Sequence, residues 1–252
     1  MIIASRHDKN MPWILALLAL LLLSGCVSQT QRTSTSAPTI NDSSGESPSS
    51  AYTQLGLAYL ERNNLPRAMK ALNRALESAP EDAQALQAMA IVYQRQGENA
   101  LARQYFQQAL SAKPNFTQAR NNYAAFLYDT GQTAEACREL QQASQDVHYP
   151  NRGQLYANLG QCQEALGNID AARESLQRAQ EINPRAPRSY FLLAQLEHQQ
   201  GNQDRAQTLI AQNIRLAGAN RNNLTLARDI AQAQGNQEQV QHYSRLLQSV
   251  SP

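Results

Sequence analysis

The sequence predicts an all-α solenoid of about six helix-turn-helix units, and its repeat period is the main reason. A turn residue recurs at intervals of 34, 34, 36, 34 and 34 residues, at Asn63, Gly97, Gly131, Gly167, Gly201 and Gly235. A period of 34 residues is typical of a helix pair that cannot bury its own apolar face and stacks on its neighbours. The composition agrees, because 42% hydrophobic and 17% charged residues, rich in Gln, Ala and Leu, suit polar-faced helices packed through small side chains. We expect units near residues 49–82, 83–116, 117–152, 153–186 and 187–220, and a degenerate sixth unit at 221–252.

Within each unit, apolar and small residues recur at fixed positions that resemble the tetratricopeptide pattern. The first unit carries Tyr52, Leu55, Gly56 and Tyr59 on its first helix, then Ala68, Leu72, Ala75 and Pro80. Small residues let the two helices approach, and larger ones would overpack the stack. The Gly or Asn supplies the turn between the helices, and proline ends the second helix. This resemblance implies a right-handed superhelix with a concave face.

The later units depart from the pattern in two places. The proline of the third unit comes two residues late, at Pro150, and Gly218 replaces the proline of the fifth unit. In the sixth unit, Arg228 occupies a small-residue position and Val240 an alanine position. Terminal repeats need a more polar outer face, so we expect the sixth unit to be a cap.

Residues 1–25 have the pattern of an export signal. Arg6 and Lys9 precede an apolar run from Trp13 to Leu23, which is too short for a transmembrane helix. The following Leu-Ser-Gly-Cys sequence resembles the bacterial lipobox, which implies that Cys26 receives a diacylglycerol and, after cleavage, an acyl chain such as palmitate on its amino group. The alternative is an ordinary signal with a chance cysteine. Val27, which stands where Asp would retain a lipoprotein at the inner membrane, favours the periplasmic face of the outer membrane.

A tether is expected between the lipid and the repeats. Residues 26–50 are rich in Ser, Thr, Pro and Gly and contain almost no large apolar side chain. Such a segment cannot bury enough surface to offset its ordering entropy. The tetratricopeptide domain is therefore expected at residues 51–252.

Two further cysteines lie on neighbouring helices of adjacent units. Cys137 falls on the second helix of unit three and Cys162 on the first helix of unit four, so a disulfide is sterically reasonable in an oxidising periplasm. The alternative is a pair of small buried thiols. Neither cysteine lies in a spacing typical of a metal site.

The sequence contains no motif that indicates an enzyme. His7, His148, His198 and His242 are dispersed, and no nucleophile, phosphate-loop or metal-protease motif occurs. We therefore expect no catalytic residue, metal, cofactor or small-molecule substrate. Lys and Arg are scattered singly and the net charge is only +2, so nucleic acid is not an expected partner.

Function is instead expected on the concave face formed by the first helices. The residues predicted to line it are Thr53, Leu57, Leu60, Gln87, Ile91, Gln94, Asn121, Ala125 and Tyr128. Leu57, Leu60 and Ile91 would form an apolar strip suited to an amphipathic helix or short apolar segment of a partner. The alternative is that these residues only pack the N-terminal edge of the stack.

The stretch around the single 36-residue step resembles one family more specifically. Its segments are Asn121-Asn122-Tyr123-Ala124-Ala125-Phe126-Leu127-Tyr128, Ala143-Ser144-Gln145-Asp146, Tyr149-Pro150 and Asn158-Leu159-Gly160. With Ala51-Tyr52-Thr53-Gln54-Leu55-Gly56-Leu57 and the lipobox, they resemble the PilF/PilW family of type IV pilus biogenesis lipoproteins. The resemblance implies a pilotin that binds the pilus secretin and promotes its outer-membrane localisation and assembly. The alternative is a tetratricopeptide lipoprotein that serves as a scaffold for outer-membrane protein assembly or cell-wall synthesis.

Overall fold

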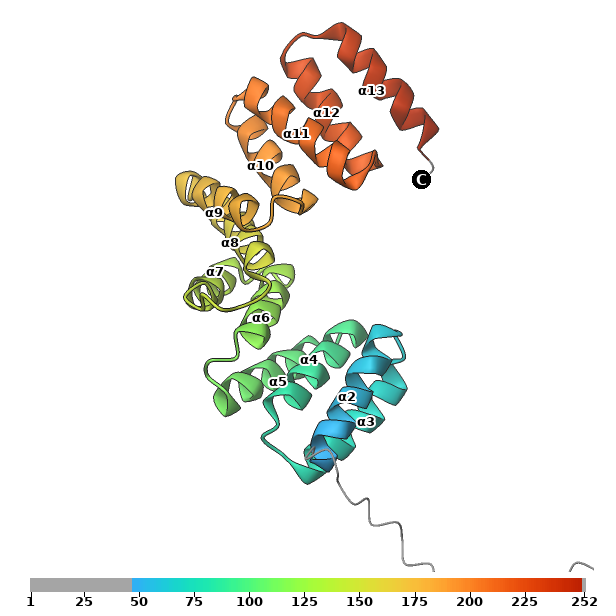
Figure 1. Cartoon of the computed structure of the whole chain (residues 1–252), viewed down its shortest axis with the longest axis vertical. Coiled ribbons are helices and arrows are strands. Elements are labelled where there is room, and N and C mark those ends of the chain that lie inside the picture. The colour runs from blue at the N-terminus through green and yellow to red at the C-terminus, as the bar shows by residue number, and fades with distance from the viewer. Residues whose placement is uncertain (1–46, 251–252) are drawn as a thin grey trace, which may run out of the picture. The chain divides into compact units, whose positions relative to one another are not determined.

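The computed structural model describes residues 47–250, which fold into six helix pairs (Figure 1). The pairs are α2 (Pro48–Glu61) with α3 (Leu65–Ser78), α4 (Ala83–Gln96) with α5 (Asn99–Ala112), α6 (Thr117–Asp129) with α7 (Thr133–Ala143), α8 (Arg152–Ala165) with α9 (Ile169–Ile182), α10 (Pro187–Gln199) with α11 (Gln203–Ala217), and α12 (Arg221–Ala233) with α13 (Gln237–Ser249). No strand occurs in this part of the chain. The predicted all-α tetratricopeptide fold is confirmed. The expected signal peptide, Cys26 and most of the expected tether lie outside the described residues.

The first helix begins earlier than the sequence suggested. Ser47 is the N-cap of α2, its side chain accepts from the backbone N–H of Ser50, and Pro48 occupies the first helical turn. Ser49 is buried, and its hydroxyl donates to the Ala75 carbonyl and to Asp82. The prediction that the tether extends to residue 50 was therefore wrong at its end. Serine and proline are common in linkers, but they are also favoured residues at the start of a helix.

Turns and close approaches follow the predicted pattern. Asn63 has φ 53° and Gly97 has φ 79°, the left-handed conformation that reverses the chain between paired helices. A Cβ added to Gly56 would lie 2.6 Å from Leu72 Cγ on the facing helix, and one added to Gly160 would lie 2.6 Å from Leu176 Cγ. The small-residue positions therefore exist because a second helix crosses directly over them.

The core runs along the stack as a series of clusters that join neighbouring units. Leu72, Phe106, Leu176 and Ile210, one from each of four second helices, are fully buried. Each lies in a cluster that also contains residues of the next unit, as Leu72 does with Met89. Each of these four units therefore buries its apolar face against the following unit, as expected for a solenoid.

The first helices form an inner layer and the second helices an outer one. Helix α2 contacts α4, and the same holds for α4 with α6, α6 with α8, α8 with α10, and α10 with α12. Within residues 47–250, no second helix comes within 8 Å, Cα to Cα, of the next second helix. A stack whose units are closer on one side curves toward that side, so the first helices form the concave face, called the inner face below.

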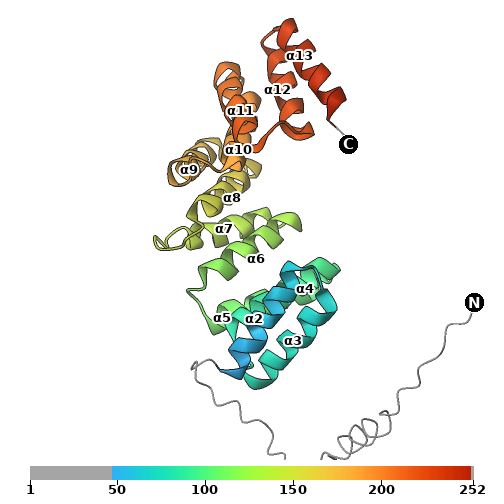
Figure 2. The same cartoon turned by 45° about the vertical axis from the view of Figure 1, so that its right-hand side comes forward.

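The sixth unit ends the stack, as Figure 2 shows for α12 and α13. Helix α12 packs on α11 and buries Leu224, Ala227 and Ile230, whereas α13 contains no buried residue. Helix α13 therefore covers α12 with a polar outer surface, which is the property expected of a cap.

Candidate functional site

The inner face of the first two units contains fewer accessible residues than predicted. Thr53 and Gln87 are only 1% and 4% exposed, and the Thr53 hydroxyl donates to Asp82 at 2.9 Å. Leu60 is also buried in the core. All three residues are buried within the stack, so their assignment to an accessible binding surface was wrong.

Leu57, Ile91 and Gln94 remain accessible. Leu57 and Ile91 are partly exposed and pack against the same core cluster, and Gln94 is partly exposed on the same helix as Ile91. Leu57 and Ile91 therefore form a short apolar strip that packs on the core, and Gln94 lies on the same helix as Ile91. Such a surface offers a partner apolar contact without a large rearrangement of the stack.

A second apolar surface lies at the N-terminal edge, where sequence analysis did not place one. Tyr52 and Leu55 on α2 are 41% and 44% exposed, whereas Leu86 and Met89, at the equivalent positions of the second unit, are buried. Leu86 and Met89 are covered because α3 packs on α4. No helix of residues 47–250 precedes α2, so Tyr52 and Leu55 stay uncovered. The signal was present in the repeat pattern, because within residues 47–250 the large residues of the first unit lack the preceding helix pair that covers their equivalents in the second unit.

The inner face of units three to five is polar and is held by a chain of side-chain hydrogen bonds. Asn158 donates to the Asn121 side-chain oxygen at 3.0 Å, and the Arg188 guanidinium donates to Asn158 Oδ1 at 2.5 Å and to Gln161 Oε1 at 2.6 Å. We call Asn121, Asn158, Gln161 and Arg188 the amide seam. It connects α6, α8 and α10, one first helix from each of three units.

The amide seam changes the interpretation of the third unit. Asn121 was predicted to be accessible, but it is 4% exposed and serves as an acceptor within the seam, so that assignment was wrong. Ala125 and Tyr128 are partly exposed, as expected. Sequence analysis missed Asn158, Gln161 and Arg188, because the predicted surface ended with the third unit.

The surroundings shift the pKa values of two charged residues on this face. Desolvation lowers the pKa of Arg188, although Tyr128 and Asp129 oppose the change electrostatically. Burial raises the pKa of Glu164, and a hydrogen bond with Gln199 partly offsets that increase. Arg188 is exposed and Glu164 half-buried, so this face presents an accessible cation and an acid close to neutral amides.

Cys137 and Cys162 form a disulfide between α7 and α8. Their Cα atoms are 5.7 Å apart, and both residues are buried. The structure therefore contains the bridge rather than two separate thiols. The bridge joins units three and four beside the amide seam's α6 and α8.

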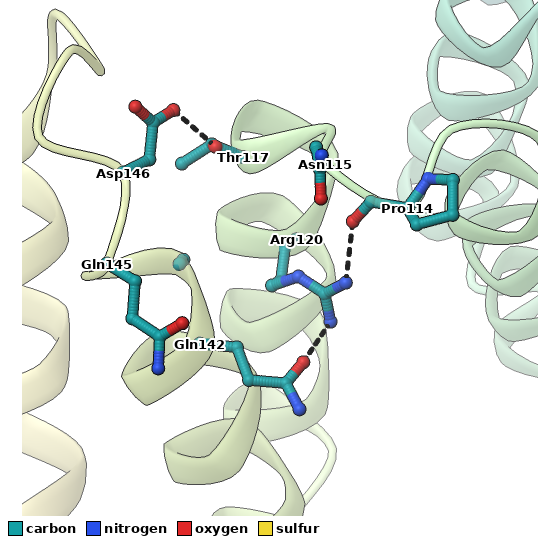
Figure 3. A pocket seen from close by; sticks show the side chains of 8 residues that line it. Pro114, Asn115, Thr117, Arg120, Gln142, Gln145 and Asp146 are labelled. Carbon is teal, nitrogen blue, oxygen red and sulfur yellow. Dashed lines mark hydrogen bonds between the residues drawn. The ribbon is translucent and has the colours of Figure 1, made fainter.

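The irregular step contains a polar hollow of about 620 Å³ between the start of α6 and the end of α7 (Figure 3). The Arg120 guanidinium donates to Glu139, to Gln142 and to the Pro114 carbonyl. Across the hollow, the Thr117 hydroxyl donates to Asp146 at 2.6 Å. Because these groups satisfy one another, the hollow is an organised junction between helices rather than a constellation of reactive groups.

The described part of the chain contains neither a candidate metal cluster nor a helix able to cross a membrane. Residues 47–250 contain no group of three or more His, Cys, Asp or Glu side chains placed to hold a metal ion. None of their helices combines the length and apolar character needed to cross a bilayer.

Comparison with known proteins identifies the family. Models of the tetratricopeptide repeat match residues 49–92, 83–116, 116–185 and 187–212. The type IV pilus assembly protein PilF of Pseudomonas aeruginosa is 32% identical over 174 residues, which cover 69% of this chain and 68% of that protein.

Two solved structures agree with this relationship. A structure from the functional characterisation of Pseudomonas aeruginosa PilF has 30% identity and a TM-score of 0.75, covering 80% of this chain and 91% of that one. PilW, described as a widely conserved type IV pilus biogenesis factor, has 28% identity and a TM-score of 0.76, covering 81% and 94%. The chain is therefore a tetratricopeptide-repeat protein that belongs to the family of the type IV pilus assembly protein PilF.

Proposed function

We propose that this protein is an outer-membrane lipoprotein of type IV pilus biogenesis that binds the pilus secretin and promotes its localisation and assembly. Its membership of the PilF family supports the role in pilus biogenesis. The observation that carries the binding proposal is the apolar surface of the first unit, where exposed Tyr52 and Leu55 lie on the same helix as partly exposed Leu57. Acyl chains on Cys26 supply the membrane anchor, and the repeats act without catalysis as a scaffold.

Binding through this surface is tested by a charge placed on it. The double variant Leu57→Asp, Ile91→Asp should abolish capture of the secretin, because an amphipathic helix cannot bury its apolar face against carboxylates. Leu101→Asp is the matched control, since Leu101 is 37% exposed on α5 of the outer layer. Thermal unfolding of each variant verifies the fold, and Tyr52→Ser tests the apolar surface at the N-terminal edge at an exposed position. Secretin capture that survives all the inner-face and edge substitutions would refute this assignment.

The role of the Cys26 lipid in outer-membrane localisation is tested separately. Cys26→Ala should leave soluble repeats that still capture the secretin but no longer bring it to the outer membrane, as measured by membrane fractionation. Unchanged secretin rings in the outer membrane would contradict the role of the lipid. Normal twitching motility after deletion of the gene would contradict the pilus role itself and favour a scaffold for outer-membrane protein assembly or cell-wall synthesis.

A further inference from the structure

Arg188 reaches across the inner face to a neighbouring unit. It lies in the first turn of α10, and its guanidinium ends on Asn158 and Gln161 of α8. Asn158 in turn bonds to Asn121 of α6. The Arg188 guanidinium is therefore held on α8, which lies between α6 and α10, by uncharged acceptors.

The acceptors of Arg188 differ from those of comparable arginines. Arg103, Arg120 and Arg173 each pair with a carboxylate, on Glu135, Glu139 and Glu197 respectively. No carboxylate oxygen of residues 47–250 lies within 4.0 Å of an Arg188 side-chain nitrogen. A carboxylate adds to a guanidinium hydrogen bond the attraction between opposite charges, which a neutral amide oxygen does not supply. Arg188 thus keeps an unused capacity for an anionic partner.

The surroundings of Arg188 define the size and character of that partner. Part of its side chain lines a hollow of about 420 Å³ whose walls include the apolar residues Ala157, Ile182 and Pro187. Asp129 acts electrostatically on Arg188, and Glu164 lies one helical turn from Gln161. A segment with several acids would be repelled by these two carboxylates, whereas a single acid beside an apolar side chain fits both the cation and the hollow.

We propose that the amide seam is a second docking site, which binds an extended segment of the protein partner carrying one Asp or Glu next to an apolar residue. The partner's carboxylate replaces the Gln161 oxygen on the Arg188 guanidinium, and the apolar side chain enters the hollow. The identity of that partner as the secretin rests on the proposed function. The amide seam lies on units three to five, whereas the apolar surface lies on the first unit. The partner therefore contacts the stack at two separate places.

Three variants of the full-length lipoprotein test the proposal by capture of secretin from detergent-solubilised envelopes. Arg188→Gln should weaken capture about tenfold or more, the effect of losing one charge-assisted bond. Arg188→Lys should weaken it several-fold, because the charge stays but the planar fork is lost. Arg178→Gln is the matched control, since Arg178 is exposed on α9 and pairs with Glu181 of the same helix.

Gln161→Ala separates binding from a merely structural role. Removal of the internal acceptor frees the guanidinium, so capture should be unchanged or several-fold stronger. A seam that only stabilises the stack would instead make Gln161→Ala and Arg188→Gln weaken capture alike, and that result would overturn the proposal. Thermal unfolding of both variants accompanies the comparison, and Gln161→Ala remains informative if Arg188→Gln does not fold.

Immobilised 15-residue peptides that cover the secretin identify the carboxylate. The wild-type protein should bind peptides in which an acid adjoins an apolar residue, and an Asp→Asn or Glu→Gln change in the peptide should remove binding. Equal binding of the acidic and amide peptides would overturn the inference. Failure of the wild-type protein to capture any secretin would refute the proposed function, whereas normal capture by both wild type and Arg188→Gln would refute the amide-seam proposal alone.

Discussion

Gly160 shows how one missing side chain sets the spacing between paired helices. A Cβ at this position would lie 2.6 Å from Leu176 Cγ and 3.0 Å from the Ala172 carbonyl oxygen. Because both contacts belong to α9, any added side chain would push α9 away from α8. Gly160→Val should lower the free energy of unfolding by about 1–3 kcal/mol, as measured by urea denaturation. Ala165→Val, at an exposed position of the same helix, should have little effect, and equal losses for the two variants would contradict this explanation.

Glu197 is a fully buried acid whose charge is balanced by residues of three helices or loops. Its carboxylate accepts from Arg173 at 3.0 Å and from Asn202 at 2.6 Å, and Arg205 lies 3.2 Å away. Glu197→Ala removes these bonds from a buried position, whereas Arg173 and Arg205 stay partly exposed and Arg173 keeps Asp170 as a partner. The substitution should therefore lower the free energy of unfolding by about 1–3 kcal/mol.

An exposed pair provides the control for Glu197. Glu181 pairs with Arg178 on the surface of α9, so Glu181→Ala should change stability by less than about 0.5 kcal/mol. Urea denaturation of both variants at pH 7 measures the difference. Similar stability losses would show that the Glu197 network contributes no more than a surface ion pair.

At the scale of helices, the disulfide ties α7 to α8 across the irregular step. Its two cysteines are 25 residues apart in the chain. Closure of a loop of this length in the unfolded state corresponds to about 3–4 kcal/mol of stability. Replacement of both cysteines by Ser should lower the free energy of unfolding by about that amount. A reducing agent should destabilise the wild-type protein but not the variant, and equal sensitivity of the two would contradict the role of the bridge.

The start of α6 is joined to the segment before α8 by a pH-sensitive contact. The Thr117 hydroxyl and the backbone N–H of His148 both donate to Asp146, and these bonds lower the pKa of its carboxyl group. The folded pKa lies below the ordinary value of about 3.9, so the contribution to stability is present above that value and is lost as the pH falls through the folded pKa.

Asp146→Asn tests this contact. The variant should be less stable than wild type at pH 7, and its stability should fall less steeply between pH 4 and pH 2. Denaturation curves across this range measure the change, with Asp129→Asn as the control at an exposed acid of α6. An unchanged acid dependence in Asp146→Asn would show that Asp146 does not couple the two segments.

At the scale of the whole molecule, stability should depend on the terminal cap. Helix α12 covers Ile210 of α11, and Asn223 donates to Asn213 at 3.0 Å. Deletion of residues 221–252 would expose this apolar surface. In a stack with mainly nearest-neighbour contacts, the effect should be largest in the adjacent unit. Hydrogen exchange should accelerate in α10 and α11 and change little in α4 and α5, and uniform acceleration along the stack would contradict this expectation.

The repeat pattern predicted the stack well because each unit repeats the same local contacts. Gly56 and Gly160 occupy positions that any matching unit needs to be small, and the disulfide followed from two cysteines on adjoining helices. Thr53 was misassigned because its position in the repeat was taken as accessible, although it is buried and bonded to Asp82, the N-cap of α4. Its burial depends on a capping residue 29 positions away rather than on the local pattern.

The repeat pattern could not predict the amide seam, for a related reason. Asn121, Asn158 and Arg188 each occur in a different unit, and no position of the repeat is shared by all three. Their contact depends on the rise and rotation between consecutive units, and the length of the sequence repeat does not specify this geometry. Individual side chains that cross between units must therefore be found in the folded stack.

The arrangement of the two layers has a mechanical consequence. Because neighbouring second helices of residues 47–250 do not contact one another directly, a change in curvature can move these outer helices apart or together without breaking a contact between them. The softest deformation is therefore a change of curvature in one plane, with the inner layer as its hinge line. A partner seated on that layer would lie close to the axis about which the stack bends, where its own contacts are least disturbed.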